Sequence, residues 1–273
     1  MSTPDLSQWY HHSLDPIALR IGDFSVPWYW LVYVFGWFWC DTMSRRISVS
    51  SESEVDQKLF DKARSDFFLW GWVSLIFCSR MTYVFIYNWS HYLKNPEQIF
   101  AIWNGGMSFH GGLIGVAIAA FAVSRAYKIS IFNLTDPIAL AIPAVLFFGR
   151  LSNFANGELP GRISTVPWAV VFPSPFDGAP RHPSQIYEAL AEGIFVGLIL
   201  FLGRKKLLTQ PGALSFGFMG LYAAARFFVE FFREPDPQLG LILGFSTGQW
   251  LCVFMMVCAI AGMAHISKSQ TRN

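Results

Sequence analysis

The sequence predicts an all-α polytopic integral membrane protein with seven transmembrane helices. Of its 273 residues, 53% are hydrophobic and only 14% are charged, whereas soluble domains carry about 25% charged residues. The apolar residues form seven blocks, each close to the roughly 20 residues that cross a hydrocarbon core as a helix. A proline-rich stretch separates the fourth block from the fifth. We therefore expect a single membrane domain over residues 1–273, with an irregular extracytoplasmic cap at 153–183.

Hydropathy places the seven helices in order along the chain. Their expected bounds are Val26 to Met43, Asp66 to Tyr87, Met107 to Tyr127, Leu134 to Phe154, Ser184 to Gly203, Gly212 to Arg233 and Gly244 to Ile266. An odd number of spans puts the two termini on opposite sides of the membrane. No basic segment followed by an apolar one occurs in the first 25 residues, so no cleaved signal peptide is expected.

Basic residues in the short loops predict the orientation, because Lys and Arg are enriched on the cytoplasmic side. Twelve of them follow the first, third, fifth and seventh helices, and five lie on the other side. We therefore expect the N-terminus outside and the C-terminus in the cytoplasm. The cap then faces outside, and its six prolines between Asn153 and Pro183 exclude a regular helix there.

Several classes of protein are disfavoured by composition and motifs. The net charge of +2 comes without a Lys/Arg-rich run, so no nucleic acid is expected as a partner. The four cysteines lie in apolar blocks without CxxC spacing, which is typical of small buried side chains. No metal-ligand cluster, P-loop or hydrolase motif is present, so we expect neither a metal nor a cofactor. No two-half repeat supports a transporter.

Ionisable side chains within the predicted helices are functional candidates, because each costs at least about 2.5 kcal/mol in a membrane. In the sixth helix Tyr222, Arg226 and Glu230 recur at i, i+4 and i+8, so they share one face and Arg226 can pair with Glu230. The alternative is a structural ion pair that locks the bundle.

The fourth helix ends in a second polar group. Arg150, Asn153 and Glu158 converge where this helix leaves the bilayer, with Gly157 and Gly161 allowing sharp turns. Packing alone does not account for such a combination.

His110, near the outer end of the third helix, is a candidate base, although a lone histidine is more often a core residue. The neighbouring Gly111 and Gly115 have the spacing of close helix packing. Tyr29 stands at the start of the first helix among tryptophans, and Arg80 in the second helix is interpreted as a buried structural cation. Two intramembrane arginines, Arg150 and Arg226, are suited to bind a phosphate with paired contacts. The residues themselves thus predict a site for an anionic phospholipid headgroup.

The segment from Gly149 to Arg162 resembles the signature of bacterial prolipoprotein diacylglyceryl transferases, G-R-x-G-N-F-x-N-x-E followed by L-x-G-R. Other landmarks of that family occur in order along the chain. They are Pro27-Trp28-Tyr29, the GGMSFHGGLIG segment ending at Gly115, HPSQIYE from His182, and the run from Tyr222 to Asp236. Two departures are Ser152 in place of the signature glycine and the absence of glycines around Arg80; we expect local repacking at Ser152 and retained activity.

The resemblance implies a transferase of lipoprotein biosynthesis in the bacterial inner membrane. It would move the diacylglyceryl group of phosphatidylglycerol to the lipobox cysteine of a prolipoprotein and release glycerol phosphate. It also implies site residues: His110, Arg150, Arg226, Glu158 and Tyr29 as catalytic, and Arg150, Asn153, Gly161, Tyr222, Arg226 and Glu230 around the substrate. His110 is the simplest base, since an unperturbed imidazole accepts a proton near pH 6.5, but substrate-assisted or arginine-assisted deprotonation stays open.

Two alternatives from other classes remain at this point. One is a transporter or lipid-binding channel that holds a headgroup without chemistry. The other is a different outer-leaflet enzyme, such as a phospholipase or headgroup transferase. Oligomeric state, acyl-chain preference and the routes of lipid entry and product exit are not predicted by the sequence.

Overall fold

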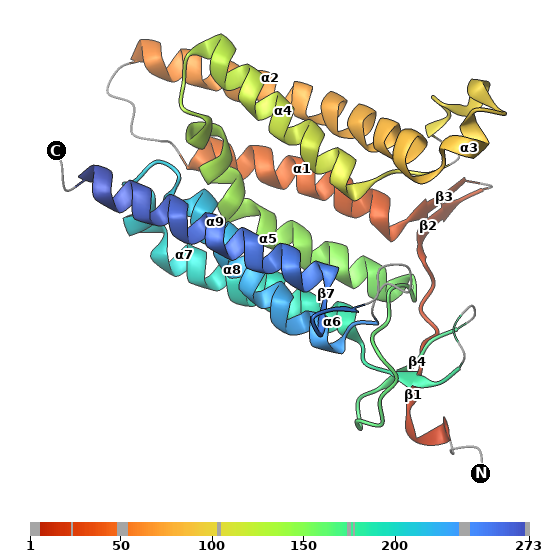
Figure 1. The fold of residues 1–273 in the computed structure, drawn as a ribbon. Coiled ribbons are helices and arrows are strands. Elements are labelled where there is room, and N and C mark those ends of the chain that lie inside the picture. The colour runs from red at the N-terminus through yellow and green to blue at the C-terminus, as the bar shows by residue number, and fades with distance from the viewer. Residues whose placement is uncertain are drawn as a thin grey trace. The chain divides into compact units, whose positions relative to one another are not determined.

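The computed structural model describes residues 6–22, 24–47, 54–102, 105–173, 176, 178–234 and 241–270. It divides into two compact units, one formed by residues 44–135 and the other by residues 1–43 together with 136–273. Helices make up most of both units, and the strands are short (Figure 1).

In the unit of residues 44–135, two long helices pack side by side (Figure 1). They are α2 (Glu54–Thr82), which continues as the π-helix η2 (Tyr83–Tyr87), and α4 (Phe109–Tyr127); the short α3 (Trp89–Tyr92) and η3 (Pro96–Gln98) lie between them in sequence. A Cβ atom on Gly111 would lie 2.4 Å from the carbonyl oxygen of Cys78, and one on Gly115 would lie 2.2 Å from that of Ser74. Close helix packing, the role predicted for these glycines, is confirmed.

The other unit contains the remaining helices. They are α1 (Trp28–Arg46), α5 (Ile131–Ala155), α6 (Ser184–Glu188) continuing through the π-helix η5 (Ala189–Phe195) into α7 (Val196–Leu207), α8 (Ala213–Val229) ending in η6 (Glu230–Phe232), and α9 (Thr247–Gln270). Its buried core joins α5, α7 and α8 through Ala139, Val196, Leu200, Leu214 and Ala225.

Short strands organise the chain around the ends of these helices. The η1 turn (Leu6–Gln8) leads into β1 (Tyr10–His11), which pairs in parallel with β4 (Val170–Val171), and β4 pairs antiparallel with β5 (Pro180–Arg181). Two hairpins complete the set, β2 (Ile17–Ile21) with β3 (Phe24–Pro27), and β6 (Leu241–Ile242) with β7 (Phe245–Ser246). The described part of the segment between α5 and α6 is thus strands and turns, as its prolines predicted.

Each segment predicted as a membrane helix is largely helical. Among the described residues, six helices are long and apolar enough to cross a membrane. The helix α1 is not among those six, because Trp and Tyr make up much of its sequence and Asp41, Arg45 and Arg46 fall in its last turns. A seventh span therefore remains a prediction. The largest difference in bounds is at α2, which begins at Glu54 and not at Asp66. Its first turns are rich in Glu, Lys and Gln, which favour helix outside an apolar environment as well.

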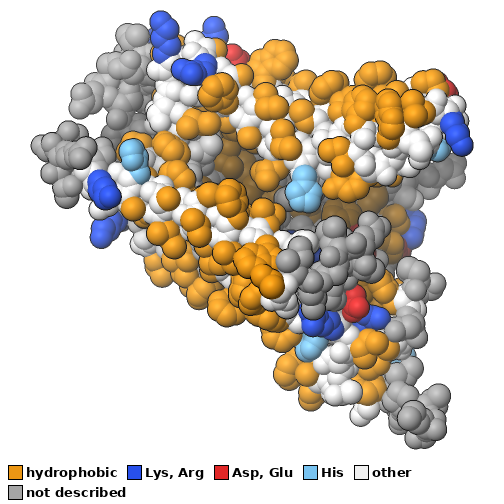
Figure 2. Space-filling model, viewed as in Figure 1, with side chains coloured by type: hydrophobic (Ala, Val, Ile, Leu, Met, Phe, Trp, Pro, Cys, Tyr) orange, Lys and Arg blue, Asp and Glu red, His pale blue; other side chains and the backbone are white. Residues whose placement is uncertain are grey.

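Apolar side chains cover the outward faces of the helices in both units (Figure 2). On α9, for example, Leu251, Phe254 and Val257 are all exposed, and their spacing places them on one helical face. Soluble proteins rarely expose contiguous apolar surface of this kind. The exposed faces are therefore suited to contact with lipid tails.

A buried carboxylate fixes the start of α8, the helix that carries Tyr222 and Arg226. Asp136 on α5 accepts hydrogen bonds from the backbone N–H groups of Gly212 (2.7 Å) and Ser215 (2.9 Å) and from the Ser215 hydroxyl (2.6 Å). It satisfies donors that a helix N-terminus leaves unpaired and places a negative charge at the positive end of the helix dipole.

Candidate functional site

The two predicted phosphate-binding arginines come together around shared carboxylates. Arg150, on the last turns of α5, lies 2.7 Å from Glu188 and 3.2 Å from Glu192. Arg226 on α8 lies 3.2 Å from the same Glu188 oxygen and 3.4 Å from Glu192. Glu188 ends α6, and Glu192 lies in the π-helix η5, a distortion that is frequent at functional sites.

The predicted pair of Arg226 and Glu230 is confirmed, with nitrogen and oxygen 3.0 Å apart. Glu230 is itself held by the Ser246 hydroxyl at 3.0 Å and lies 3.4 Å from Arg233. Arg233 also pairs with Glu188. Three arginines and three glutamates thus form one connected cluster of zero net formal charge, in which each carboxylate fixes the direction of a guanidinium.

The charges of this cluster differ in exposure. The side chains of Glu188 and Glu192 are 0% exposed, whereas those of Arg150 and Arg226 are 19% and 17% exposed. An incoming group therefore meets guanidinium first and carboxylate only behind it. Among the described residues, the ion pairs of Arg150 use Nε and Nη2, so Nη1 takes part in none of them.

Tyr29, Asn153 and Glu158 lie next to the ionic cluster in sequence or space. The Asn153 side-chain amide donates a hydrogen bond to the Tyr29 hydroxyl, which ties the start of α1 to the end of α5. The Asn156 amide donates to the Glu158 carboxylate at 2.8 Å, and the Gln185 amide donates to the Glu158 backbone carbonyl at 2.6 Å.

Gly161 is required by a close crossing of three chain segments. A Cβ atom there would lie 2.3 Å from the Phe232 carbonyl oxygen and 2.9 Å from His182. The Gly161 N–H donates to the His182 carbonyl at 2.9 Å, and the Arg162 N–H donates to the Phe232 carbonyl at 2.9 Å. The segment after α5 is thereby bound to the residues that precede α6 and to the end of η6.

His182 lies beside this crossing and is part of an aromatic cluster. Its ring contacts Phe232 edge-on, with centroids 5.2 Å apart, and its Nδ1 is 3.0 Å from the Tyr187 hydroxyl. Burial lowers the pKa of His182 below its ordinary value of 6.5, so the ring is neutral at pH 7. The motif that begins at His182 thus contributes a structural contact here.

The N-terminal segment also supports the site. The His12 imidazole is 2.6 Å from the Phe154 carbonyl oxygen and stacks on Phe172, and the Trp9 indole donates to the Val166 carbonyl at 3.0 Å. These contacts stabilise both ends of the segment that carries Glu158 and Gly161. Local sequence patterns do not predict these contacts, because they join residues more than 140 positions apart.

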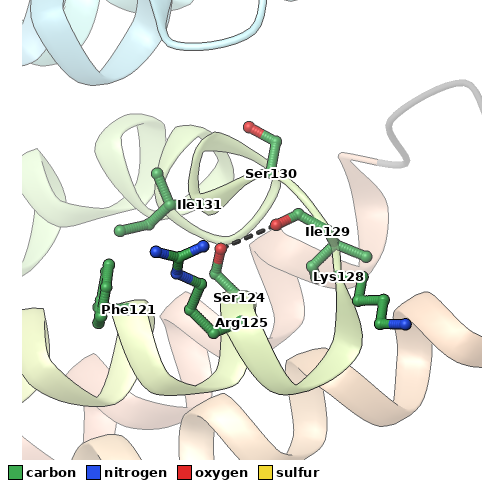
Figure 3. Close-up of a pocket in the computed structure, with 7 residues that line it drawn as sticks. All are labelled: Phe121, Ser124, Arg125, Lys128, Ile129, Ser130 and Ile131. Atoms are coloured by element: carbon green, nitrogen blue, oxygen red, sulfur yellow. Dashed lines mark hydrogen bonds between the residues drawn. The ribbon is translucent and has the colours of Figure 1, made fainter.

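His110 belongs to the unit of residues 44–135. It lies in the first turn of α4 and is exposed. The Ser108 hydroxyl caps this helix by accepting from the Gly111 N–H at 3.2 Å. A surface pocket of about 420 Å³ occurs at the far end of α4, lined by Phe121, Ser124, Arg125, Lys128, Ile129, Ser130 and Ile131 (Figure 3). The pocket is therefore separate from the residues predicted to act in the reaction.

Glu188 and Glu192 were not predicted as site residues, although the sequence carries a signal for them. Both lie within a predicted span, four residues apart, and two carboxylates inside a membrane helix require cationic partners. Tyr222 interacts electrostatically with Glu192 and both arginines. In the part of the chain that the structure describes, no group of three His, Cys, Asp or Glu residues could hold a metal ion.

Comparison with known proteins shows the family of the chain. A family model described as "Prolipoprotein diacylglyceryl transferase" matches residues 16–265. The chain is 40% identical to a phosphatidylglycerol–prolipoprotein diacylglyceryl transferase of Rhizobium meliloti over 94% of this chain and 93% of the relative. It is 40% identical to the protein of that name from Idiomarina loihiensis, over 97% of this chain and 98% of the relative. For the one from Bordetella bronchiseptica, identity is 43% over 92% and 94%.

Proposed function

The chain belongs to the prolipoprotein diacylglyceryl transferase family, and from this premise we propose the reaction that it catalyses and the residues that carry it. The enzyme transfers the diacylglyceryl group of phosphatidylglycerol to the cysteine thiol of a prolipoprotein lipobox. This is the first step of lipoprotein maturation.

The reaction is a displacement at carbon. The thiol loses its proton to a base, and the thiolate sulfur attacks the glycerol carbon that carries the phosphate ester. A carbon–sulfur bond forms, the carbon–oxygen bond breaks, and glycerol phosphate leaves with the electron pair. Negative charge moves from sulfur to the phosphate, so cations fixed in advance around the phosphate lower the barrier.

The observation that carries the proposal is the exposure of Arg150 and Arg226 in front of fully buried Glu188 and Glu192. The carboxylates hold the two guanidinium groups in place before substrate arrives. The exposed parts of the guanidinium groups are then available to phosphate oxygens, for which their planar geometry is suited.

The remaining residues serve the same headgroup. Glu230 orients Arg226 through the 3.0 Å contact, and Tyr222 lies among the same charges. Asn153, paired with Tyr29, and Glu158 supply polar contacts beside the phosphate. Gly161 keeps the segment in its tight crossing.

His110 is the base in this proposal. It is an exposed histidine at the start of α4, and histidine is the side chain that most often serves as a general base. None of the enzyme's own cysteines takes part, since the nucleophile belongs to the acceptor protein.

The enzyme acts in the bacterial cytoplasmic membrane with its N-terminus outside and its C-terminus in the cytoplasm. Six membrane-capable helices within the described ranges support a multi-pass arrangement, and the excess of basic residues in one set of loops supports the orientation.

The test is an assay of purified enzyme with phosphatidylglycerol and a lipobox peptide, with mass spectrometry of the peptide. We expect a mass increase of one diacylglyceryl group and release of glycerol phosphate. A peptide with serine in place of the cysteine should give neither product. Lipid cleavage that proceeds without an acceptor thiol would indicate a phospholipase, and lipid binding without any product would indicate a channel or transporter.

For the base, we expect His110→Asn to keep its KM for the lipid while kcat falls by about 10²- to 10⁴-fold, as is typical when a general base is lost. The residual rate should rise as the pH approaches about 8.5, where a free thiol ionises without help. The control is the wild-type pH series at saturating lipid. If the variant instead loses lipid binding at every pH, His110 holds the lipid, and Glu158 and Glu230 become the next candidates for the base.

A further inference from the structure

Arg80 is a buried cation whose guanidinium is bound by backbone carbonyls. It lies near the end of α2, is 2% exposed, and pairs with no carboxylate among the described residues. Its Nε donates to Ile99 at 2.7 Å and its Nη2 to Gln98 at 2.6 Å. Its Nη1 donates to Gly106 at 3.0 Å and also to Gly105. One side chain therefore binds four carbonyl oxygens, two on each side of the turn before α4.

The same segment is fixed by the neighbour of Arg80. The Ser79 hydroxyl donates to the Ser108 carbonyl at 2.8 Å, and the Ser108 N–H donates to the Ser79 carbonyl at 3.0 Å. Gly105 and Gly106 both have φ of +78°, which brings their carbonyls to Arg80 without the strain that another residue would suffer. His110 follows Ser108 by two residues.

We propose that Arg80 is a positioning residue of the transfer reaction, which binds the carbonyls on both sides of the turn before α4 and thereby sets the place and direction of His110. The proposal rests on the role of His110 in the proposed function. This role differs from that of a purely structural cation. A structural cation would stabilise the packing of α2 and α4, whereas a positioning residue affects the reaction through His110.

Arginine is suited to this task and lysine is not. The planar guanidinium has five N–H donors in fixed directions, and Arg80 uses all three of its nitrogens. A lysine ammonium keeps the charge but has three donors on one atom. Arg80→Lys therefore leaves at least one of the four carbonyls without its partner and loosens the turn.

The experiment is a double-mutant cycle on the full-length enzyme. Arg80→Lys is expected to lower kcat by about tenfold to 100-fold, the loss that a displacement near 1 Å causes, with KM for phosphatidylglycerol changed less than about threefold. In the His110→Asn background the same change should have little further effect, because the two residues act in series. Hydrogen exchange of the described residues from Ile99 to Ser108 should become faster.

The control is Arg64→Lys, the same substitution on the same helix. Arg64 is also buried, pairs with Asp61 at 2.8 Å, and stands 16 residues before Arg80, about 24 Å along a helix. This variant should keep the wild-type kcat. If Arg80→Lys does not fold, Ser79→Ala replaces it in the cycle, since it removes one hydrogen bond to the same segment.

The outcomes separate the two proposals. Losses that multiply in the double variant, or unchanged exchange in Arg80→Lys, would overturn the positioning role and leave the proposed reaction intact. A wild-type rate for His110→Asn would overturn the base assignment, and the role of Arg80 with it.

Discussion

A single substitution at Arg150 separates the effect of guanidinium geometry from the effect of positive charge. Its guanidinium pairs with Glu188 and Glu192 through Nε and Nη2, and Nη1 takes part in neither ion pair. We predict that Arg150→Lys lowers kcat/KM for transfer to a lipobox peptide by at least about 100-fold, the loss seen when one donor to a developing anion is removed. Because lysine keeps the positive charge, the loss of activity measures the contribution of the planar guanidinium geometry.

The matched control for Arg150→Lys is Arg204→Lys. Arg204 lies near the end of α7 and donates to the Phe201 carbonyl, away from the cluster. The Arg204→Lys variant should transfer the diacylglyceryl group at the wild-type rate. Near-normal transfer by Arg150→Lys would mean that Arg150 supplies only charge, and the phosphate would then have to be bound by other residues.

Gly161 gives a second prediction for a single residue. In Gly161→Ala the new Cβ atom would lie 2.3 Å from the Phe232 carbonyl oxygen, so backbone must move and the crossing of segments opens. We expect the free energy of unfolding to fall by about 1–3 kcal/mol, as for other overpacked sites, and transfer to be lost. Thermal unfolding in detergent and the peptide assay measure the two effects.

Gly217→Ala in α8 is the control, because its Cβ atom would meet Leu200 at an ordinary 3.5 Å. That variant should be as stable as the wild type or more so, since alanine favours helix. Equal stability of Gly161→Ala and Gly217→Ala would show that the crossing tolerates a side chain.

The sequence could select single residues only where a chemical rule applied. Arg226 and Glu230 were predicted to pair because their spacing places them on one helical face, and they do. Glu188 and Glu192 were not selected, although both lie in the predicted span that begins at Ser184. Their partners come from α5 and α8, and such long-range pairing is not visible in local spacing.

Among the elements, α8 depends on a residue of another helix for its start. Asp136 accepts three hydrogen bonds at this N-terminus, and Asp136→Asn replaces one acceptor oxygen with a donor. We predict a fall in the free energy of unfolding of about 1–3 kcal/mol, the cost of leaving a buried donor unpaired. Thermal unfolding in detergent measures it.

The comparison for Asp136→Asn is Asp61→Asn, which removes a carboxylate that is 56% exposed and pairs with Arg64. Because this carboxylate is largely solvated, we expect its removal to cost less than about 1 kcal/mol. Similar losses in the two variants would argue against a special role of Asp136 in starting α8.

Elements were predicted well where hydropathy defines them and poorly where tertiary contacts do. The helices from α4 to α9 begin and end within a few residues of the apolar blocks. The π-helical turns η2 and η5 and the strand pair of β1 with β4 were not predicted. The strand pair joins segments that are distant in the sequence, and the apolar pattern carries no signal for it or for the π-helical turns.

For the whole molecule, composition was sufficient to predict a helical membrane protein. Six helices in the described part of the chain have membrane-spanning length and hydropathy, in agreement with this prediction. The seventh span depends on α1, whose tryptophans and tyrosines are typical of a membrane interface as well as of a span. Whether α1 crosses the membrane therefore has to be decided from the positions of the termini, because an even number of spans would put both termini on the same side.

Orientation is open to a direct test with two single-cysteine variants in a background in which Cys40, Cys78, Cys252 and Cys258 are replaced by serine or alanine. Thr165→Cys lies in the predicted cap, and Lys205→Cys lies in the basic cluster after α7; both positions are exposed. The reagent is a maleimide that does not cross membranes, applied to intact spheroplasts and to inverted vesicles.

We predict that Thr165→Cys is labelled in spheroplasts and Lys205→Cys only in inverted vesicles. The physical reason is the loop asymmetry of twelve basic residues against five, because basic loops stay in the cytoplasm. An added cysteine beyond residue 268 should behave like Lys205→Cys if α1 crosses the membrane, whereas one near Leu6 should behave like Thr165→Cys. Labelling of both termini from the same side would reduce the spans to six, and labelling of Thr165→Cys only in inverted vesicles would place Arg150 and Arg226 at the wrong face for an exported acceptor.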